Sequence, residues 1–284
     1  MIRATPETRP RRLARTLALI AALAAGPASP GVADPQDTPW HNGLRQAYFG
    51  DRPILETGEV IRLQAPERAE DAAFVPIRIE ARIPQTPERY IRTVTLIIDK
   101  NPSPVAGVFH FTPRSGRADL AMRVRINEYT PIRAIAETSE GKLYMSQRFI
   151  KASGGCSAPV GTDLDEAMAR LGQTRLRLKG PQAPHSPLQV QLAVRHPNLT
   201  GLQMDQVTRL YAPPRFVNSV EVSFEGSPVF SARTDISISE NPNFRFYFVP
   251  DRAGELKATI HDTSGALFTK TLSVSPPRST AGGR

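Results

Sequence analysis

Residues 75–82 read VPIRIEAR, and this alternation of apolar and polar side chains is typical of a β-strand with one buried face. The same period of two recurs through the first half of the chain, at 59–64, 93–98, 106–111, 119–126, 132–137 and 142–150. Proline, glycine, asparagine or serine separates these segments, as expected of turns. Short strands at this spacing predict an antiparallel immunoglobulin-like (Ig-like) β-sandwich.

The second half of the chain repeats this pattern. Its predicted strands are 188–195, 218–224, 228–233, 243–249, 255–261 and 266–274. Phe244, Phe246 and Phe248 alternate within one strand and should face the core. Segments 137–144 and 262–268 resemble each other, each with a glycine at a hairpin turn. We therefore predict an all-β fold of two tandem Ig-like antiparallel β-sandwich domains.

The composition favours an all-β chain and excludes several kinds of site. The 284 residues include 27 Pro, nearly twice the usual share of roughly 5%. Because proline disrupts helix interiors, this content argues against a helical bundle. The single Cys excludes an internal disulfide, and also a thiolate zinc site or an iron–sulfur cluster held by this chain alone.

Two segments outside the sandwiches are predicted to carry short helices. The first is 40–49, ahead of the first sandwich. In the second, Asp163 provides an N-cap and acidic residues fill the first turn of a helix ending near Gly172, before a proline-rich linker at 179–187. The predicted order is an N-terminal segment 34–58, a sandwich 59–156, the helix and linker 157–187, a second sandwich 188–275 and a disordered tail 276–284.

Residues 1–33 have the three parts of a cleaved signal peptide. Arginines precede the apolar run 17–25 (LALIAALAA), and 31–33 (GVA) offers a small-residue cleavage site. The apolar run is about half of the roughly 20 residues that a transmembrane helix needs. We therefore expect export to the periplasm, with no membrane span after cleavage.

The charge distribution argues against a nucleic-acid partner. The net charge is +9, and 1–33 contains five Arg and one Glu, which leaves +5 on the rest of the chain. Seven arginines of the first half alternate with apolar residues and are predicted to lie on solvent-exposed strand faces: Arg78, Arg82, Arg89, Arg92, Arg123, Arg125 and Arg133. With no clustered basic tract, we expect no nucleic acid to bind.

The single thiol, Cys156, is the main candidate for chemistry. It lies in SGGCSAPVG (153–161), where Gly154 and Gly155 predict a flexible backbone and an exposed sulfur. Only its thiolate would attack or carry a group. The five histidines show no spacing that suggests a base for this thiol, so we predict no catalytic, cofactor-binding or metal site. An incidental loop cysteine is the alternative interpretation.

Two sets of motifs resemble known families. Segment 75–155, with VPIRIEA, IIDKNPSPVAGVFHF, RVRI and EGKLYMS before SGGC, resembles SoxY, the thiol carrier subunit of periplasmic sulfur oxidation. Segment 189–274, with VRHPNLTGL, SENPNFRFYF and DTSGALF, resembles its partner subunit SoxZ. The whole resembles the fused SoxYZ-like carrier proteins associated with quinoprotein alcohol dehydrogenases.

The resemblance implies a covalent carrier that is not itself an enzyme. In SoxY a Gly-Gly-Cys-Gly-Gly arm carries sulfur intermediates on its Cys, as in thiosulfate oxidation. Gly154, Gly155 and Cys156 match its first three positions, whereas Ser157 and Ala158 replace the last two glycines. The resemblance therefore implies covalent cargo attachment at Cys156 and a hinge at the two glycines.

The same resemblance implies two kinds of partner. Periplasmic oxidoreductases or sulfur-oxidation enzymes would load and unload the thiol, and the SoxY-like and SoxZ-like domains would contact each other within one chain. The alternative is a scaffolding or binding module for a periplasmic quinoprotein dehydrogenase or cytochrome, in which the thiol is dispensable. A self-contained thiol enzyme is disfavoured because no base accompanies the cysteine.

Overall fold

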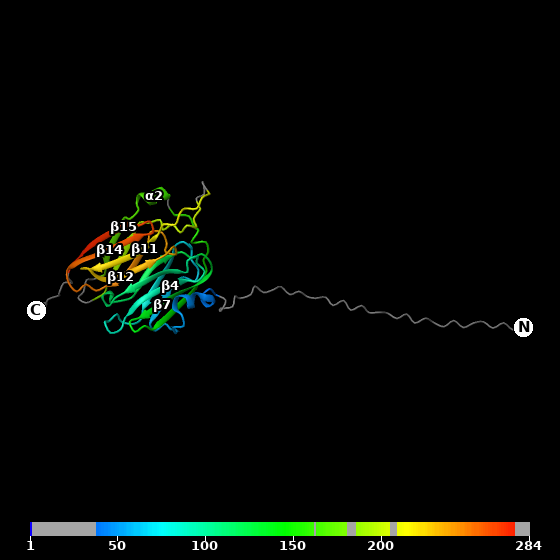
Figure 1. The fold of residues 1–284 in the computed structure, drawn as a ribbon, viewed down its shortest axis with the longest axis horizontal. Helices are drawn as coiled ribbons and strands as arrows, with labels where there is room; N and C mark the ends of the chain where they lie inside the picture. Colours follow the sequence, from blue (N-terminus) through cyan, green and yellow to red (C-terminus); the bar gives the residue numbers. More distant parts are fainter. Residues whose placement is uncertain (2–37, 162, 181–185, 205–208, 276–284) are drawn as a thin grey trace. The chain divides into compact units, whose positions relative to one another are not determined.

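The protein is described by a computed structural model that covers Met1 and residues 38–161, 163–180, 186–204 and 209–275 (Figure 1). The predicted signal peptide beyond Met1, the tail 276–284 and positions 181–185 of the predicted linker lie outside the described residues. The structure is 48% strand and 8% helix. This confirms the predicted all-β class.

The strands of the first half include every one predicted there. They are β1 (Ile54–Glu56), β2 (Ile61–Gln64), β3 (Val75–Ala81), β4 (Ile91–Ile98), β5 (Val105–Phe111), β6 (Leu120–Val124), β7 (Thr130–Thr138) and β8 (Leu143–Ile150). The same holds for the second half. Its strands are β9 (Thr174–Lys179), β10 (Leu188–Val194), β11 (Val217–Phe224), β12 (Ser227–Thr234), β13 (Asn243–Phe248), β14 (Gly254–Asp262) and β15 (Leu267–Val274).

The helices are short. The predicted helix at 40–49 is present as two consecutive turns, η1 (Trp40–Leu44) and α1 (Arg45–Phe49). A 3₁₀ turn, η2 (Pro113–Ser115), follows β5. The predicted second helix is α2 (Leu164–Ala169), and the Asp163 side chain caps it by accepting the Asp165 and Glu166 N–H groups. No helix of the described residues is long and apolar enough to cross a membrane.

The two halves of the chain share both sheets. One sheet has the order β1-β8-β7-β4-β5-β12-β11-β14-β15, and the other β2-β3-β6-β13-β10-β9. The halves join where β5 pairs antiparallel with β12, from Phe111↔Phe230 to Gly107↔Thr234, and where β13 meets β6 at Arg245↔Ala121. Figure 1 shows the cyan and green strands alongside the yellow to red ones. The two halves therefore contact each other, as expected, and they do so through two sheets that run continuously across both halves.

A single apolar core fills the space between the sheets. One cluster of buried side chains runs from Val60 to Val274 and includes residues of both halves. At the junction, the rings of Phe230 and Phe246 stack with centroids 4.3 Å apart, and Phe111 packs on Phe230 at 5.5 Å. Phe244, Phe246 and Phe248 are all buried, as their alternation predicted.

Two strands were not predicted from the sequence. The short β1 pairs in parallel with β8. Strand β9 lies within 157–187, which was interpreted as only helix and linker, and it pairs antiparallel with β10 at one edge of its sheet. Of its alternating residues TRLRLK, only Leu176 is buried. An edge strand with a polar outer face gives a weak apolar signal, which explains the omission.

The prediction that seven arginines face solvent is wrong for two of them. Arg133 is 3% exposed, because Trp40 of η1 lies 4.9 Å from its guanidinium and covers this part of the sheet. Its charge is paired with buried Asp99 at 2.9 Å. Arg125 is 1% exposed and belongs to the candidate site described below. In both cases a segment distant in sequence covers a strand face that periodicity assigned to solvent.

Because the core is continuous, we expect the two halves to unfold together. Replacing Phe230 by Ala removes a ring stacked at the junction and should cost about 3–5 kcal/mol of unfolding free energy. Differential scanning calorimetry should show a single unfolding transition for the native protein. In Phe230→Ala the transition should remain single and move to a lower temperature. Phe149→Ala, at a side chain 51% exposed, is the control and should change little. Two separate transitions in the native protein would contradict a shared core.

Candidate functional site

Cys156 is buried, which corrects the expectation of an exposed thiol. Its exposed fraction is 0%, although Ser153 and Gly154 before it and Ser157 after it are exposed. It is the free cysteine of the chain. We call residues 153–157 the thiol arm. The arm follows β8, turns back at Gly154, whose φ is +78°, and inserts its sulfur into the protein.

Hydrogen bonds from several segments hold the thiol arm. The Gly154 N–H donates to the Asn127 carbonyl at 2.8 Å, and the Gly155 N–H donates to the Ile126 carbonyl at 2.9 Å. A Cβ at Gly155 would collide with the Ala72 carbonyl and would lie 2.7 Å from the Ile126 carbonyl. The second glycine is therefore required for close approach of the backbone in this docked position.

Arg125 holds the arm from the first half of the chain. It directly follows β6, and its backbone N–H donates to the Ser237 carbonyl at 2.7 Å. Its guanidinium Nη1 donates to the Gly155 carbonyl at 3.1 Å. The sequence did not identify this residue, because alternation placed it with the solvent-facing arginines. The docked arm covers it instead.

Thr200 holds the arm from the second half. Its hydroxyl donates to the Cys156 carbonyl at 2.7 Å. Thr200 itself is oriented by Gln203, whose Oε1 accepts the Thr200 N–H at 2.8 Å. The HPNLTG motif (196–201) of the second half therefore contacts the thiol arm of the first half.

His196 and Asn198 build the loop that carries Thr200. The Asn198 N–H donates to His196 Nδ1 at 3.0 Å, which leaves Nε2 facing Asp262 Oδ2 at 3.4 Å. Burial lowers the pKa of His196, so the ring is neutral near pH 7. Arg215 pairs with the same Asp262 oxygen at 2.8 Å. These contacts give His196 a structural role in the loop.

The electrostatics of the site favour the protonated thiol. Burial raises the pKa of Cys156 to about 11, and the positive charge of Arg125 opposes this shift only in part. Near neutral pH the docked sulfur is therefore a poor nucleophile. Lys151, which precedes the arm, pairs instead with Glu67 at 2.7 Å. In the part of the chain that the structure describes, no cluster of three or more His, Cys, Asp or Glu side chains could hold a metal ion.

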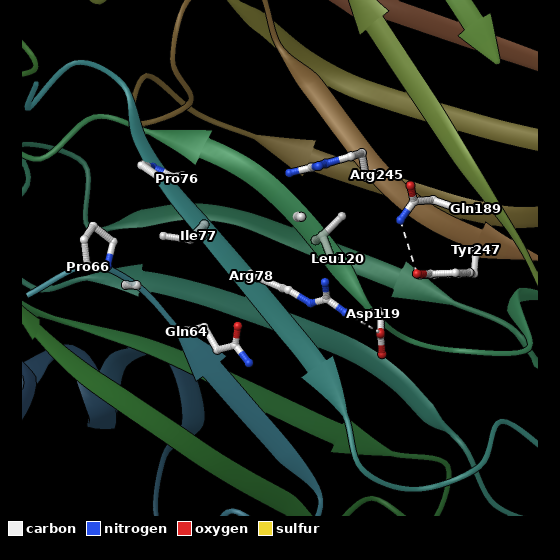
Figure 2. Close-up of a pocket in the computed structure, with 12 residues that line it drawn as sticks. Gln64, Pro66, Pro76, Ile77, Arg78, Asp119, Leu120, Gln189, Arg245 and Tyr247 are labelled. Atoms are coloured by element: carbon white, nitrogen blue, oxygen red, sulfur yellow. Dashed lines mark hydrogen bonds and ion pairs between the residues drawn. The ribbon is translucent and has the colours of Figure 1, made fainter. Parts of the chain in front are cut away.

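Two surface cavities with polar linings lie away from Cys156. One, of about 240 Å³, spans both halves, and Figure 2 shows Arg78 and Asp119 on one side of it and Gln189, Arg245 and Tyr247 on the other. A second, of about 350 Å³, is lined by five arginines and no carboxylate. The arginines are Arg123, Arg170, Arg175, Arg177 and Arg195. Such a cavity is suited to an anion, but Cys156 does not line either one.

The comparisons with protein families match both halves of the chain. Residues 45–156 match the family model of the sulfur oxidation protein SoxY. Residues 176–273 match the family model of the sulphur oxidation protein SoxZ. The chain therefore belongs to the fused SoxYZ-like proteins, with a SoxY domain followed by a SoxZ domain. These domains imply a carrier or partner role in sulfur oxidation. The SoxY match ends at Cys156.

Comparisons with other known proteins add little. No curated protein matches the sequence. The similar solved structures include superoxide reductase (neelaredoxin) from Ignicoccus hospitalis, with 18% identity, 32% of this chain and 79% of that chain covered, and a TM-score of 0.30. A putative superoxide reductase from Thermotoga maritima has 18% identity, coverage of 36% and 95%, and a TM-score of 0.31. A glycosyl hydrolase family 2 member from Bacteroides cellulosilyticus has 10% identity, coverage of 80% and 30%, and a TM-score of 0.22.

We expect Gly155→Ala to release the thiol arm, because its Cβ cannot fit against the Ala72 and Ile126 carbonyls. Cys156 should then react faster with an aromatic disulfide reagent, by at least roughly tenfold, the factor that corresponds to about 1.4 kcal/mol. The absorbance of the aromatic thiolate that the reagent releases measures the rate. Gly58→Ala is the control, since nothing lies within 4 Å of a Cβ there. An unchanged rate in Gly155→Ala would contradict the docked arm.

Docking of the arm should weaken at alkaline pH. Burial raises the pKa of Cys156 from 9.0 to about 11, so the docked state favours the neutral thiol. The resulting stabilisation is complete below about pH 9 and is lost as the pH rises from 9 towards 11. The melting temperature of the native protein should therefore fall more steeply over this range than that of Cys156→Ser. Parallel curves for the two proteins would argue against a buried titrating thiol.

Proposed function

We propose that this protein is a periplasmic thiol carrier that holds a small sulfur-containing cargo covalently on Cys156 and presents it to separate enzymes. The observation that carries the proposal is the position of Cys156. It is the last residue of the SoxY match, and it follows two glycines. It also lies on an arm held by residues of both domains. The signal-like features of 1–33 support the periplasmic location.

Loading joins two sulfur atoms and needs an electron acceptor. With thiosulfate as the cargo, a bond forms between the Cys156 sulfur and the terminal sulfur of thiosulfate. The thiol loses its proton, and two electrons leave the sulfur atoms. A partner oxidoreductase must accept these electrons, since the thiol alone supplies no oxidant. Hydrolysis at the sulfonate would release sulfate and leave a persulfide on Cys156. A partner oxidoreductase would have to take up the electrons from oxidation of that outer sulfur before a second hydrolysis restores the thiol.

The arm must leave its docked position before a partner can reach the sulfur. Release breaks the four hydrogen bonds of Gly154, Gly155 and Cys156 to Asn127, Ile126, Arg125 and Thr200. The three between neutral groups are worth about 1 kcal/mol net each, and the one from Arg125 about 2 kcal/mol. A docking partner would have to offset this cost with its own contacts. We propose that Gly154 and Gly155 act as the hinge for this movement. Fusion of the two domains keeps both sides of the docking site in one molecule.

The alternative function is a scaffolding module for a periplasmic quinoprotein dehydrogenase or cytochrome. One observation favours it: the thiol is buried and, with its pKa raised to about 11, it is protonated near neutral pH. A cysteine whose side chain only fills space in the core would have the same burial and the same raised pKa in the docked state. The two functions differ in whether the sulfur is needed.

Cys156→Ser should abolish carrier function while leaving partner binding intact, because serine keeps the arm but cannot form the sulfur–sulfur bond. Oxidation of the sulfur substrate by cells or by reconstituted partners measures carrier function. Co-purification measures partner binding. Ser273→Ala, at an exposed position of β15, is the control and should support normal flux. Equal flux in Cys156→Ser would refute the carrier and leave the scaffolding module.

The cargo can be identified from the protein itself. Intact mass of the protein purified from its native compartment, with and without reductant, should reveal an adduct that peptide mapping places on Cys156. Its mass gives the composition of the cargo. An unmodified thiol in actively oxidising cells would count against covalent transport.

A further inference from the structure

Arg125 is a buried charge whose hydrogen-bonding capacity is only partly used. The side chain is 1% exposed. Its Nη1 donates to the Gly155 carbonyl, but Nε and Nη2 are buried and have no hydrogen-bond partner among the described residues. Unsatisfied buried donors are uncommon in native proteins, and a charged one is costly. The folded chain alone therefore does not account for this arginine.

The carboxylates around Arg125 compensate its charge only from a distance. Glu240 and Asp71 both interact electrostatically with it. Neither forms an ion pair with Arg125 within the described residues. Glu240 Oε2 accepts the Gly161 N–H at 3.0 Å, and Asp71 Oδ1 accepts the Ala73 N–H at 2.7 Å. Two donors of the guanidinium thus remain available for another acceptor.

A second unused donor belongs to the same site. Gln203 is 4% exposed, and its buried Nε2 has no hydrogen-bond partner in the described part of the chain. Its Oε1 orients Thr200, which in turn binds the Cys156 carbonyl. Arg125 binds the neighbouring Gly155 carbonyl. Both residues with unused donors are therefore at most one side chain away from the arm that carries the thiol.

We propose that Arg125 binds the negatively charged end of the group attached to Cys156 when the arm is docked, with Gln203 as an additional donor. This inference rests on the proposed carrier function. Arginine presents its N–H groups in a planar fork that matches the oxygens of a sulfonate or carboxylate. An anion there would satisfy the unused donors and neutralise the buried charge. The docked position would then shelter a loaded anionic cargo more firmly than a neutral one.

Two adducts of nearly equal size test this inference on the full protein. Iodoacetate and iodoacetamide each alkylate Cys156, in mild denaturant followed by refolding, and leave a carboxymethyl or a carbamidomethyl group. We expect the anionic adduct to keep the arm docked and the neutral adduct to release it. Hydrogen exchange of the 154–157 amides should be slower in the anionic adduct by roughly tenfold, as for one charge-assisted hydrogen bond.

Arg125→Met should abolish this difference, and Arg148→Met, which changes an exposed arginine, should leave it intact. If Arg125→Met does not fold, Arg125→Lys keeps the charge but not the fork and should reduce the difference. Equal exchange for the two adducts in the native protein would overturn the inference, whatever the variants do. A difference that persists in Arg125→Met would overturn it as well.

The two proposals fail in distinguishable ways. If Cys156→Ser supports normal flux but the adducts differ, the site binds anions and the carrier function is refuted. If Cys156 is required for flux but the adducts behave alike, the carrier stands and Arg125 only anchors the arm.

Discussion

The antiparallel pairing of β5 with β12 is the constraint on which the rest of the structure depends. It connects strands of the two domains in the nine-stranded sheet, through Phe111↔Phe230 and the following pairs. The shorter contact of β13 with β6 does the same in the six-stranded sheet. The aromatic side chains at the junction then pack in one core, with Phe230 stacked on Phe246. An edge strand left unpaired would expose a row of backbone donors and acceptors. Each domain therefore completes the sheets of the other.

This junction also determines where the thiol lies. Residues that follow β6 and residues of the 196–203 loop come from different domains, and the shared sheets bring them to the same place. Arg125 and Thr200 bind consecutive carbonyls of the arm. The SoxZ domain is thus part of the site that holds the SoxY thiol, and fusing the two domains keeps that site in one molecule.

In the proposed carrier, burial gives the thiol a resting state that differs from its working state. A sulfur with 0% exposure and a pKa raised to about 11 is protected from adventitious reaction. The hydrogen bonds that hold the arm to the rest of the protein are few, so contacts with a docking partner can offset the cost of releasing it. We infer a carrier in which reactivity depends on the position of the arm. In that carrier, the buried charge of Arg125 would link the position of the arm to the charge of the group on Cys156.

Local pattern was sufficient to predict the fold class and to single out Cys156 as the candidate residue. Alternation in VPIRIEAR and NFRFYF predicted strands and their buried faces because the side-chain period of a strand is two. Strand β9 was missed because an edge strand buries little apolar surface, and only Leu176 of it is buried.

The site itself depended on contacts that no local pattern contains. Arg125 follows a strand whose alternation points it to solvent, and Gly154 and Gly155 suggested a free arm. Both expectations changed because the arm folds back onto the end of β6 and the SoxZ loop covers it. The sequence by itself determined most of the strands and the position of the single thiol in the chain. The tertiary structure alone decided that the thiol is buried and which charge lies beside it, because burial depends on segments far apart in the chain.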